Sequence, residues 1–340
     1  MSVAGVVRVG ALVGIGAALV GALIRSRRRW DLTDRTVLVT GGSRGLGLLV
    51  AEELLRAGAR VAICARDRDT LDRARAQLAQ APAGRVLAIP CDVSLREDVE
   101  SMVRQVGEQL GPIDAVVNNA GTIIVGPADV MELEDFEAAM NVNFWGPVHV
   151  ILAVLPEMRR RVAGRIVNVA SIGGKISVPH LLPYSASKFA LVGLSEGLRA
   201  ELAGDGIQVS TICPGLMRTG SPRHALFKGR HRAEYAWFSV SDSLPIVSMS
   251  AERAARQIVD ALRYGTAERI LSLPAKLAVA MHGLFPGLTA DLLGLVNRGL
   301  PGSEGEPARR RVKGEASTSD VSPSWITTLN EQAARRANQV

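Results

Sequence analysis

The feature that most constrains the fold is a regular alternation of short apolar segments with amphipathic segments along residues 36–273. The apolar segments are rich in Val, Ile, Leu and Ala, which is typical of strands buried on both faces of a parallel sheet. The predicted strands are 36–40, 60–65, 85–93, 114–121, 164–174, 207–215 and 268–273, and the predicted helices are 48–59, 66–81, 94–111, 134–161, 182–202 and 250–265. This alternation predicts an α/β fold with a doubly wound parallel sheet between two layers of helices.

Ligands bind such sheets beyond the carboxyl ends of the strands, and the unusual residues of this sequence fall there. They are Gly41–Gly47, Arg66, Asp92, Asn118–Gly121, Ser171 and Pro214–Gly215. The segment TGGSRGLG, Thr40–Gly47, supplies the tight turn and helix start that a diphosphate requires. A glycine turn can also simply connect a strand to a helix, but the strand–turn–helix context favours a Rossmann-like nucleotide site.

The residues after the second predicted strand indicate which nicotinamide cofactor is preferred. An acidic residue there would bind the ribose 2′-hydroxyl of NAD(H), whereas this sequence has Arg66 followed by Asp67. Arg44 in the glycine turn can reach the same place, and guanidinium groups match the geometry of a 2′-phosphate. We therefore expect NADP(H) in preference to NAD(H), with Asp67 capping the next helix.

Tyr184 and Lys188 lie four residues apart in a segment predicted to be helical, in a chain with only three tyrosines. Residues i and i+4 share one face of a helix, so the ammonium group can lower the phenol pKa from about 10. Such a phenol can protonate a carbonyl oxygen or deprotonate an alcohol. Taken alone, the pair fits a buried tyrosine beside an exposed lysine equally well. Ser171, at the end of a predicted strand, adds a hydroxyl that can reach the same substrate oxygen.

Over roughly residues 33–272 the chain resembles the classical short-chain dehydrogenase/reductase family. The matching motifs are Thr40–Gly47 as TGxxxGxG, Asn118–Gly121 as NNAG, Asn143, Ser171, Tyr184–Lys188 as YxxxK, and Pro214–Thr219 as PGxxxT. The resemblance implies that Tyr184 is the general acid/base, that Lys188 holds the nicotinamide ribose and lowers the tyrosine pKa, that Ser171 orients the substrate carbonyl, and that Asn143 supports a water relay from Lys188. The implied cofactor-binding residues are Gly41, Ser43, Arg44, Gly45, Leu46, Gly47, Arg66, Asp92, Val93, Asn119, Ala120, Gly121, Tyr184, Lys188, Pro214, Gly215 and Thr219.

The N-terminal segment Val3–Ile24 is apolar except for Arg8, and RSRRR follows it. Twenty-two helical residues span about 33 Å, enough to cross the hydrocarbon core of a bilayer. The arginines after this segment favour a membrane anchor with a cytoplasmic catalytic domain over a cleavable signal peptide; a helix packed on the protein is the other alternative. Residues 1–29 hold five arginines and no acid out of a net charge of +7. The nearly neutral remainder argues against nucleic-acid binding.

The remaining segments complete the predicted organisation. We expect a membrane-anchor helix with its basic flank in residues 1–30, and the Rossmann-fold catalytic domain in 31–273 with a substrate-covering lid over about 216–249. An apolar helical extension is expected in 274–301 and a largely disordered polar tail in 302–340, with a short helix near TTLNEQAARRANQV. The extension can contact membrane, substrate entrance or a second subunit. The lid holds Phe227, Tyr235, Trp237 and Phe238, which can line an apolar pocket or pack the lid onto the body.

These features predict a membrane-anchored, NADP(H)-dependent oxidoreductase that interconverts an alcohol with a ketone or aldehyde on a lipophilic substrate. The family resemblance implies a dimer or tetramer paired through the helices that hold Asn143 and Tyr184. No metal site is predicted, because the five histidines lack ligand-like spacing with cysteine or carboxylate residues. Three alternatives remain: a non-enzymatic NAD(P)-binding redox sensor, an epimerase or dehydratase with the same fold, and a structural membrane adaptor.

Overall fold

The computed structural model describes residues 29–81, 85–244, 248–303, 309–318 and 328–339. Its central element is a seven-stranded sheet with the strand order β11-β7-β6-β4-β1-β2-β3, in which all neighbours are parallel. The strands are β1 (Thr36–Thr40), β2 (Arg60–Ala65), β3 (Val86–Pro90), β4 (Ala115–Asn118), β6 (Gly164–Val169), β7 (Ile207–Pro214) and β11 (Glu268–Leu271). The predicted doubly wound parallel sheet is confirmed. The predicted N-terminal apolar helix lies outside the described residues.

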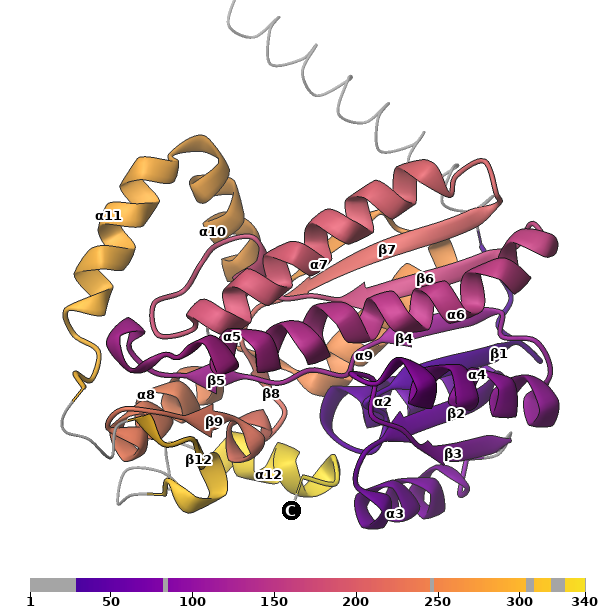
Figure 1. Cartoon of the computed structure of the whole chain (residues 1–340), viewed down its shortest axis with the longest axis horizontal. Coiled ribbons are helices and arrows are strands. Elements are labelled where there is room, and N and C mark those ends of the chain that lie inside the picture. Colours follow the sequence, from indigo (N-terminus) through magenta and orange to yellow (C-terminus); the bar gives the residue numbers. More distant parts are fainter. Residues whose placement is uncertain (1–28, 82–84, 245–247, 304–308, 319–327, 340) are drawn as a thin grey trace, which may run out of the picture.

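Helices cover both faces of this sheet (Figure 1). One face carries α2 (Gly45–Arg56), α3 (Arg68–Leu78) and α9 (Ala251–Tyr264), and the other carries α4 (Arg96–Leu110), α6 (Gly146–Arg160) and α7 (Leu182–Glu201). The order in which strands are added reverses between β1 and β4: β2 and β3 extend the sheet on one side, and β6, β7 and β11 extend it on the other. Open α/β sheets bind ligands at such a switch point. The three-layer αβα arrangement agrees with the sequence prediction.

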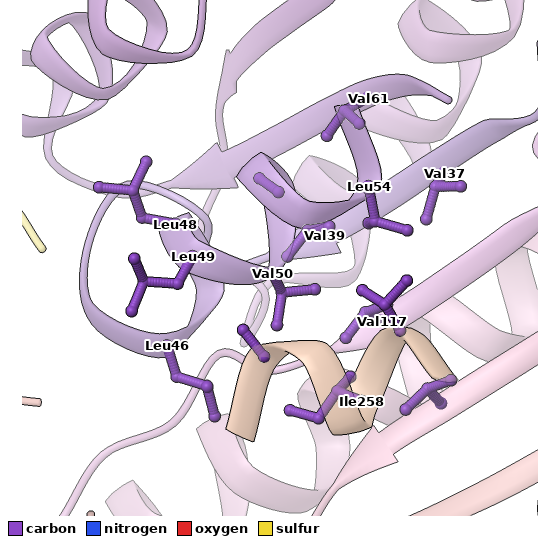
Figure 2. Close-up of a cluster of buried hydrophobic side chains, with 14 of the residues drawn as sticks. Val37, Val39, Leu46, Leu48, Leu49, Val50, Leu54, Val61, Val117 and Ile258 are labelled. Atoms are coloured by element: carbon purple, nitrogen blue, oxygen red, sulfur yellow. The ribbon is translucent and has the colours of Figure 1, made fainter. Parts of the chain in front are cut away.

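The core lies between the sheet and its helices. Figure 2 shows the α2 side of the sheet, where Val37, Val39, Val61 and Val117 from the strands meet the apolar residues of α2 and Ile258 of α9. Of these residues, Val37, Val39, Val61, Val117 and Ile258 are fully buried. Because the strands are buried on both faces, their sequences read as continuous apolar runs rather than as alternating ones. This packing fixes the carboxyl ends of β1 and β4, and therefore the positions of the loops that follow them.

The predicted long helix over 134–161 is interrupted in the structure. It consists of α5 (Leu133–Met140), a π-helical segment η2 (Asn141–Trp145), and α6. Within the described part of the chain, Leu133–Arg160 is the stretch long and apolar enough to cross a membrane by length and composition. One side of it packs against α4 and α7, so this stretch belongs to the helical layer on one face of the sheet.

The segment between β7 and α9 covers the carboxyl edge of the sheet. It contains β8 (Met217–Arg218), η4 (Ser221–His224), β9 (Leu226–Phe227), α8 (His231–Ser243) and β10 (Met249–Ser250). Strand β10 pairs with β8, and β9 pairs with β5 (Ile124–Val125). This segment corresponds to the predicted lid. Phe227 and Tyr235 pack inside it, whereas Trp237 and Phe238 line a cavity described below.

Beyond β11 the chain forms a helical hairpin of α10 (Leu273–Leu284) and α11 (Pro286–Asn297), which projects from the body (Figure 1). This agrees with the apolar helical extension expected from the sequence. In the tail, the short helix expected near the end of the chain is present as α12 (Thr328–Arg336), whereas the ordered contacts of the described residues differ from the predicted disorder. Strand β12 (Val312–Lys313) pairs with β9, and α12 packs against α8 and β8. The polar composition of the tail does not predict these contacts, because their partners lie in distant parts of the chain.

Candidate active site

A cavity of about 620 Å3 opens at the carboxyl ends of the strands, between the glycine turn and the lid. All predicted catalytic and cofactor-binding residues line it except Gly47 and Asn143. These two lie directly behind the lining and support it, as described below. The structure therefore brings together residues from six separate loops, as expected from the topology of a parallel sheet.

The glycine turn after β1 requires its glycines. Gly41 and Gly45 have positive φ values of 66° and 58°, which residues with a Cβ rarely adopt. A Cβ on Gly47 would collide with the backbone carbonyl of Gly41, so α2 can begin close to β1 only with glycine there. Arg44 precedes α2 and makes no side-chain hydrogen bond to its first amides. This helix N-terminus fits a diphosphate, because the helix dipole and amides without a side-chain cap attract anions. The amide of Gly45 is bonded to a backbone carbonyl of the tail, as described below.

The NNAG segment after β4 is tied to the glycine turn. The Thr40 hydroxyl accepts hydrogen bonds from the amides of Asn119 and Ala120, at 3.0 and 3.1 Å. The Asn119 side chain donates back to the carbonyls of Thr40 and Gly41, both at 3.2 Å. These bonds hold two neighbouring loops of the cavity in a fixed relation. Their spacing is set by the pairing of β1 with β4.

The end of β2 carries a cluster of positive charge. Arg44 and Arg66 both line the cavity, and the positive charge of Arg66 adds to burial in lowering the pKa of Arg44. The Arg66 guanidinium lies 3.9 Å from the Asp92 carboxylate and is otherwise well exposed. Asp67 caps α3, accepting a 2.8 Å hydrogen bond from the amide of Thr70, so the predicted capping role is confirmed. Two guanidinium groups that repel each other form a suitable place for an anion.

Tyr184 and Ser171 meet at the inner end of the cavity. Ser171 follows β6, and its hydroxyl lies near enough to the Tyr184 phenol, which α7 presents from its first turn, to lower the phenol pKa. The Ser171 hydroxyl also accepts a 3.0 Å hydrogen bond from the amide of Gly173, which fixes its position. Burial raises the pKa of Tyr184 to about 12, and the Ser171 hydroxyl opposes this only in part. The phenol is therefore protonated at neutral pH.

Lys188 lies on the same face of α7 but does not lower the phenol pKa in this structure. Its Nζ donates a 2.9 Å hydrogen bond to the carbonyl of Val169 and lies 5.8 Å from the centre of the Tyr184 ring. Burial lowers the pKa of Lys188 itself to about 8. The expected lowering of the tyrosine pKa by Lys188 is thus corrected: the ammonium is directed at a backbone carbonyl, and desolvation of the phenol dominates.

Asn143 sits in the π-helical segment behind the cavity wall. Its Oδ1 accepts from the amide of Thr122 at 2.9 Å, and its Nδ2 donates to the carbonyl of Thr122 and to Ser187 Oγ. A Cβ on Gly121 would lie 3.1 Å from Asn143 Oδ1 and 3.8 Å from Lys188 Nζ, so Gly121 separates the two side chains. Single-turn π-helices occur often at functional sites. Here the wider turn directs a fully buried asparagine at the NNAG loop.

The C-terminal tail reaches the glycine turn, which sequence reasoning missed. The amide of Gly45 donates a 2.7 Å hydrogen bond to the carbonyl of Ala337, and Asn338 Nδ2 donates to the carbonyls of Ser43 and Thr70. Gln339 lines the cavity. The Ala337 carbonyl therefore accepts a hydrogen bond from the Gly45 amide, which would otherwise be free to bind an anion. The sequence gives no local signal for this contact.

Two further polar residues near the substrate end differ in whether they reach the cavity. His180, which the sequence places just before Tyr184, is buried beside Glu234, with Nδ1 2.8 Å from the Glu234 carboxylate, and does not line the cavity. Asp242 on α8 does line the cavity and was not anticipated, because the lid sequence breaks the strand–helix pattern. Among the described residues, no group of histidine, cysteine and acidic side chains could hold a metal ion.

Comparisons with known proteins agree with this site. A family model described as short chain dehydrogenase matches residues 35–226. The chain is 36% identical over 220 residues to the dehydrogenase/reductase SDR family protein 7-like of Anopheles gambiae, covering 64% of this chain and 69% of that protein. It is 38% identical over 184 residues to ketoacyl reductase HetN of Nostoc, covering 54% and 64%. It is 38% identical over 204 residues to 17-beta-hydroxysteroid dehydrogenase 13 of Mus musculus, covering 57% and 64%.

Solved structures are similar over most of the chain. A short-chain dehydrogenase from Streptomyces avermitilis superposes with a TM-score of 0.67 at 30% sequence identity, covering 78% of this chain and 98% of that one. A short-chain dehydrogenase/reductase from Mycobacterium marinum gives a TM-score of 0.63 at 29% identity, covering 71% and 95%. Since those chains are covered almost completely, the parts of this chain beyond them are additions to a shared fold.

Proposed function

Since this chain belongs to the short-chain dehydrogenase family and is a dehydrogenase/reductase, we propose that it interconverts a lipophilic ketone or aldehyde and the corresponding alcohol with NADP(H). The observation that carries the proposal is the Ser171–Tyr184 hydroxyl pair, with Lys188 on the same helix face, at the inner end of one cavity that begins at the glycine turn. The bound dinucleotide would supply or accept a hydride. The remaining chemistry is the movement of one proton, which these side chains perform.

The hydroxyl pair suits reduction of a carbonyl. A phenol whose pKa is about 12 stays protonated at neutral pH, yet it is still more acidic than an ordinary alcohol. Tyr184 therefore donates its proton to the oxygen on which negative charge develops, and Ser171 donates a second hydrogen bond to that oxygen. Lys188, held by the Val169 carbonyl, would hold ribose hydroxyls of the cofactor, and Asn143 lies behind the cavity lining and bonds to the neighbouring Ser187.

We propose that the glycine turn, Arg66, Asp92, Val93, the NNAG segment and Pro214–Thr219 hold the cofactor, with Arg44 and Arg66 around its 2′-phosphate. Replacing both arginines by alanine is expected to lower the ratio of kcat/KM with NADPH to that with NADH by about 10- to 100-fold, because a hydrogen bond to a charged group contributes about 1.5–3 kcal/mol. The measurement is steady-state kinetics with both cofactors. Arg68→Ala, an exposed arginine outside the cavity, serves as the control. An unchanged ratio in the double variant would contradict the NADP(H) preference.

The substrate end of the cavity supports a lipophilic substrate. Ile123, Val178, Leu181, Trp237 and Phe238 line it. The similar proteins named above include a ketoacyl reductase and a hydroxysteroid dehydrogenase, whose names indicate carbonyl or alcohol chemistry on largely apolar skeletons. Incubating the purified protein with NADPH and a panel of ketones tests the activity. A redox sensor would bind NADPH without turnover, an epimerase or dehydratase would convert substrate without net loss of NADPH, and a structural adaptor would do neither.

We further propose that the chain is anchored to a membrane with its catalytic domain on the cytoplasmic side. The apolar residues 3–24 and the arginines after them support this, and so does the α10–α11 hairpin. The hairpin exposes large apolar side chains on both helices: Leu273, Leu277, Met281, Leu284, Phe285, Leu288, Leu292, Leu295 and Val296. Exposed Lys276 and Asp291 interrupt the apolar surface of the two helices, so the large apolar side chains form a stripe along each helix, and such a stripe packs against protein or lipid. Each has 12 residues and reaches about 18 Å, too short to span a bilayer, so we place the hairpin at its surface.

Flotation with phosphatidylcholine vesicles measures this membrane contact. The full chain is expected to float, and a chain lacking residues 1–29 is expected to bind vesicles more weakly through the hairpin. In that shortened chain, Leu284→Glu with Leu288→Glu should lower binding by at least about tenfold, since burial of one leucine contributes about 1.5–3 kcal/mol. Leu133→Glu changes a leucine that is equally exposed on α5 and should leave binding unchanged. Equal binding of the hairpin and control variants would contradict a surface role for the hairpin.

A homo-oligomer paired through α6 and α7 is the proposed assembly. Leu152 on α6, Phe189 on α7 and Trp145 just before α6 are large apolar side chains with 59%, 41% and 46% of their surface exposed. A face formed by two long helices with exposed apolar residues supports self-association.

A further inference from the structure

Asp242 is a buried carboxylate at the cavity wall with no partner in the described protein. It lies near the C-terminal end of α8, 4% of its surface is exposed, and it lines the cavity. No hydrogen bond or ion pair to it occurs among the described residues, and burial alone raises its pKa to about 8. Buried acidic side chains are nearly always paired. A carboxyl group in this position therefore calls for a partner from outside the chain.

The surroundings of Asp242 place it in the substrate end of the cavity. Phe238 lies one turn earlier on the same face of α8 and also lines the cavity, as do Trp237 and Ser241. The negative charge of Asp242 contributes to raising the pKa of Tyr184, so the two groups share one weakly solvated compartment. Phe238 packs in the same apolar cluster as Leu181 and Tyr184. Asp242 is thus a carboxyl group in a wall that also contains Phe238, Trp237 and Ser241, and it is near enough to the reacting phenol to affect the pKa of Tyr184.

An unpaired buried carboxyl group lowers the stability of the folded protein. Its desolvation costs free energy that no hydrogen bond in the protein returns. Groups of this kind persist where a ligand supplies the missing partner, and stability and function are then in conflict at that residue. The hydroxyl groups of Tyr184 and Ser171 already have a role at the carbonyl, so they do not account for the position of Asp242.

We propose that Asp242 is a specificity-determining residue that accepts a hydrogen bond from a hydroxyl group of the substrate, distant from the carbonyl that is reduced. The substrate class is accordingly a hydroxylated lipophilic ketone, or the diol that corresponds to it. This inference rests on the proposed carbonyl reduction and makes it more specific. A hydroxyl both donates and accepts, so it pairs with the carboxyl group in either protonation state, whereas an ammonium group pairs only with the carboxylate. A site built around such a bond rejects analogues that lack the hydroxyl.

Three matched substrates test the proposal: straight-chain methyl ketones of about the cavity length, their ω-hydroxy derivatives and their ω-methoxy derivatives. The wild-type enzyme is expected to show kcat/KM at least tenfold higher for the best hydroxy ketone than for its plain counterpart. The methoxy compound, which cannot donate, should resemble the plain ketone. Absence of NADPH oxidation with every ketone would reject the proposed function itself. Oxidation with equal kcat/KM across the three series would reject only the role of Asp242.

Two variants separate recognition from a structural or catalytic role. Asp242→Leu is expected to abolish the preference for the hydroxy ketone over the plain ketone, through KM for the hydroxy ketone, and Asp242→Asn should restore part of the preference. Glu108→Leu removes an exposed carboxylate on α4 and should retain the wild-type preference for the hydroxy ketone. Because the carboxyl is unpaired, Asp242→Leu should melt at the same temperature as wild type or higher. A lower melting temperature, weaker NADPH binding without substrate, or an equal loss on all three ketones would each overturn the proposal.

Discussion

Replacing Tyr184 by phenylalanine is expected to lower kcat for ketone reduction by about 10²–10⁴-fold, the usual contribution of a positioned acid or base. The change removes one oxygen atom and keeps the ring that packs against Gly173 and the lid cluster. The fold and the cofactor end of the cavity should therefore persist, and the dissociation constant for NADPH should change little. Single-turnover and steady-state kinetics, together with fluorescence titration of NADPH, measure the two quantities separately.

The control for this variant is Tyr264→Phe, at the C-terminal end of α9 and outside the cavity. It should retain wild-type kcat, which shows that loss of a tyrosine hydroxyl as such does not impair the enzyme. Ser171→Ala removes the hydroxyl that partly offsets the high pKa of Tyr184, so we expect a smaller decrease in kcat than for Tyr184→Phe. Retention of more than a tenth of the wild-type kcat in Tyr184→Phe would be incompatible with Tyr184 as the proton donor.

The sequence predicts the sheet and the location of the site because both depend on local patterns. The apolar runs and the intervening amphipathic helices identify the strands, and parallel crossover connections then bring their carboxyl ends to one edge. Residues as distant as Gly41, Ser171 and Pro214 accordingly line one cavity. What the spacing of Tyr184 and Lys188 cannot predict is side-chain direction. The structure directs Lys188 Nζ to Val169, and burial of the phenol then decides its pKa.

The features that the sequence did not predict involve partners far apart in the chain. Asn338 donates to the carbonyl of Ser43 across 295 positions, and Arg311 bonds to Asp135 across 176. A polar tail rich in Gly, Ser and Pro resembles a disordered segment until its partners are known. The π-helical turn at Asn141–Trp145 is likewise set by the tertiary contacts of Asn143, since local helix propensity does not distinguish it from an ordinary helix.

Replacing Asp135 by alanine is expected to lower the free energy of unfolding by about 3–5 kcal/mol, the cost of leaving one partner of a buried ion pair alone. Asp135 and Lys228 are both fully buried, with Nζ 2.7 Å from Oδ2, and Arg311 Nε lies 2.6 Å from Oδ1. The group joins α5, the lid and the tail. Without Asp135, the fully buried Lys228 keeps only the more exposed Glu132, at 2.9 Å.

The pH dependence of this effect follows from the pKa of Asp135. Burial raises that pKa, but hydrogen bonds from Lys228, the amide of Glu132 and Arg311 outweigh burial and lower it below its usual value. A carboxyl group whose pKa is lower in the folded state stabilises the protein above its unfolded pKa of about 3.9, and this contribution is lost as the pH falls through the folded value. The difference between wild type and Asp135→Ala should thus be full at neutral pH and should decrease only in strong acid.

Denaturant unfolding at neutral and acidic pH measures this difference, with Glu137→Ala as the control. Glu137 is exposed on the same helix, and its loss should change stability by no more than about 0.5 kcal/mol. The double variant Asp135→Leu with Lys228→Met should recover part of the loss, because it leaves neither charge of the pair buried alone. The single variants Asp135→Leu and Lys228→Met are measured beside it. If the stability lost in the double variant equals the sum of the two single losses, the two side chains do not act as a pair. Apolar packing would then hold the lid to α5.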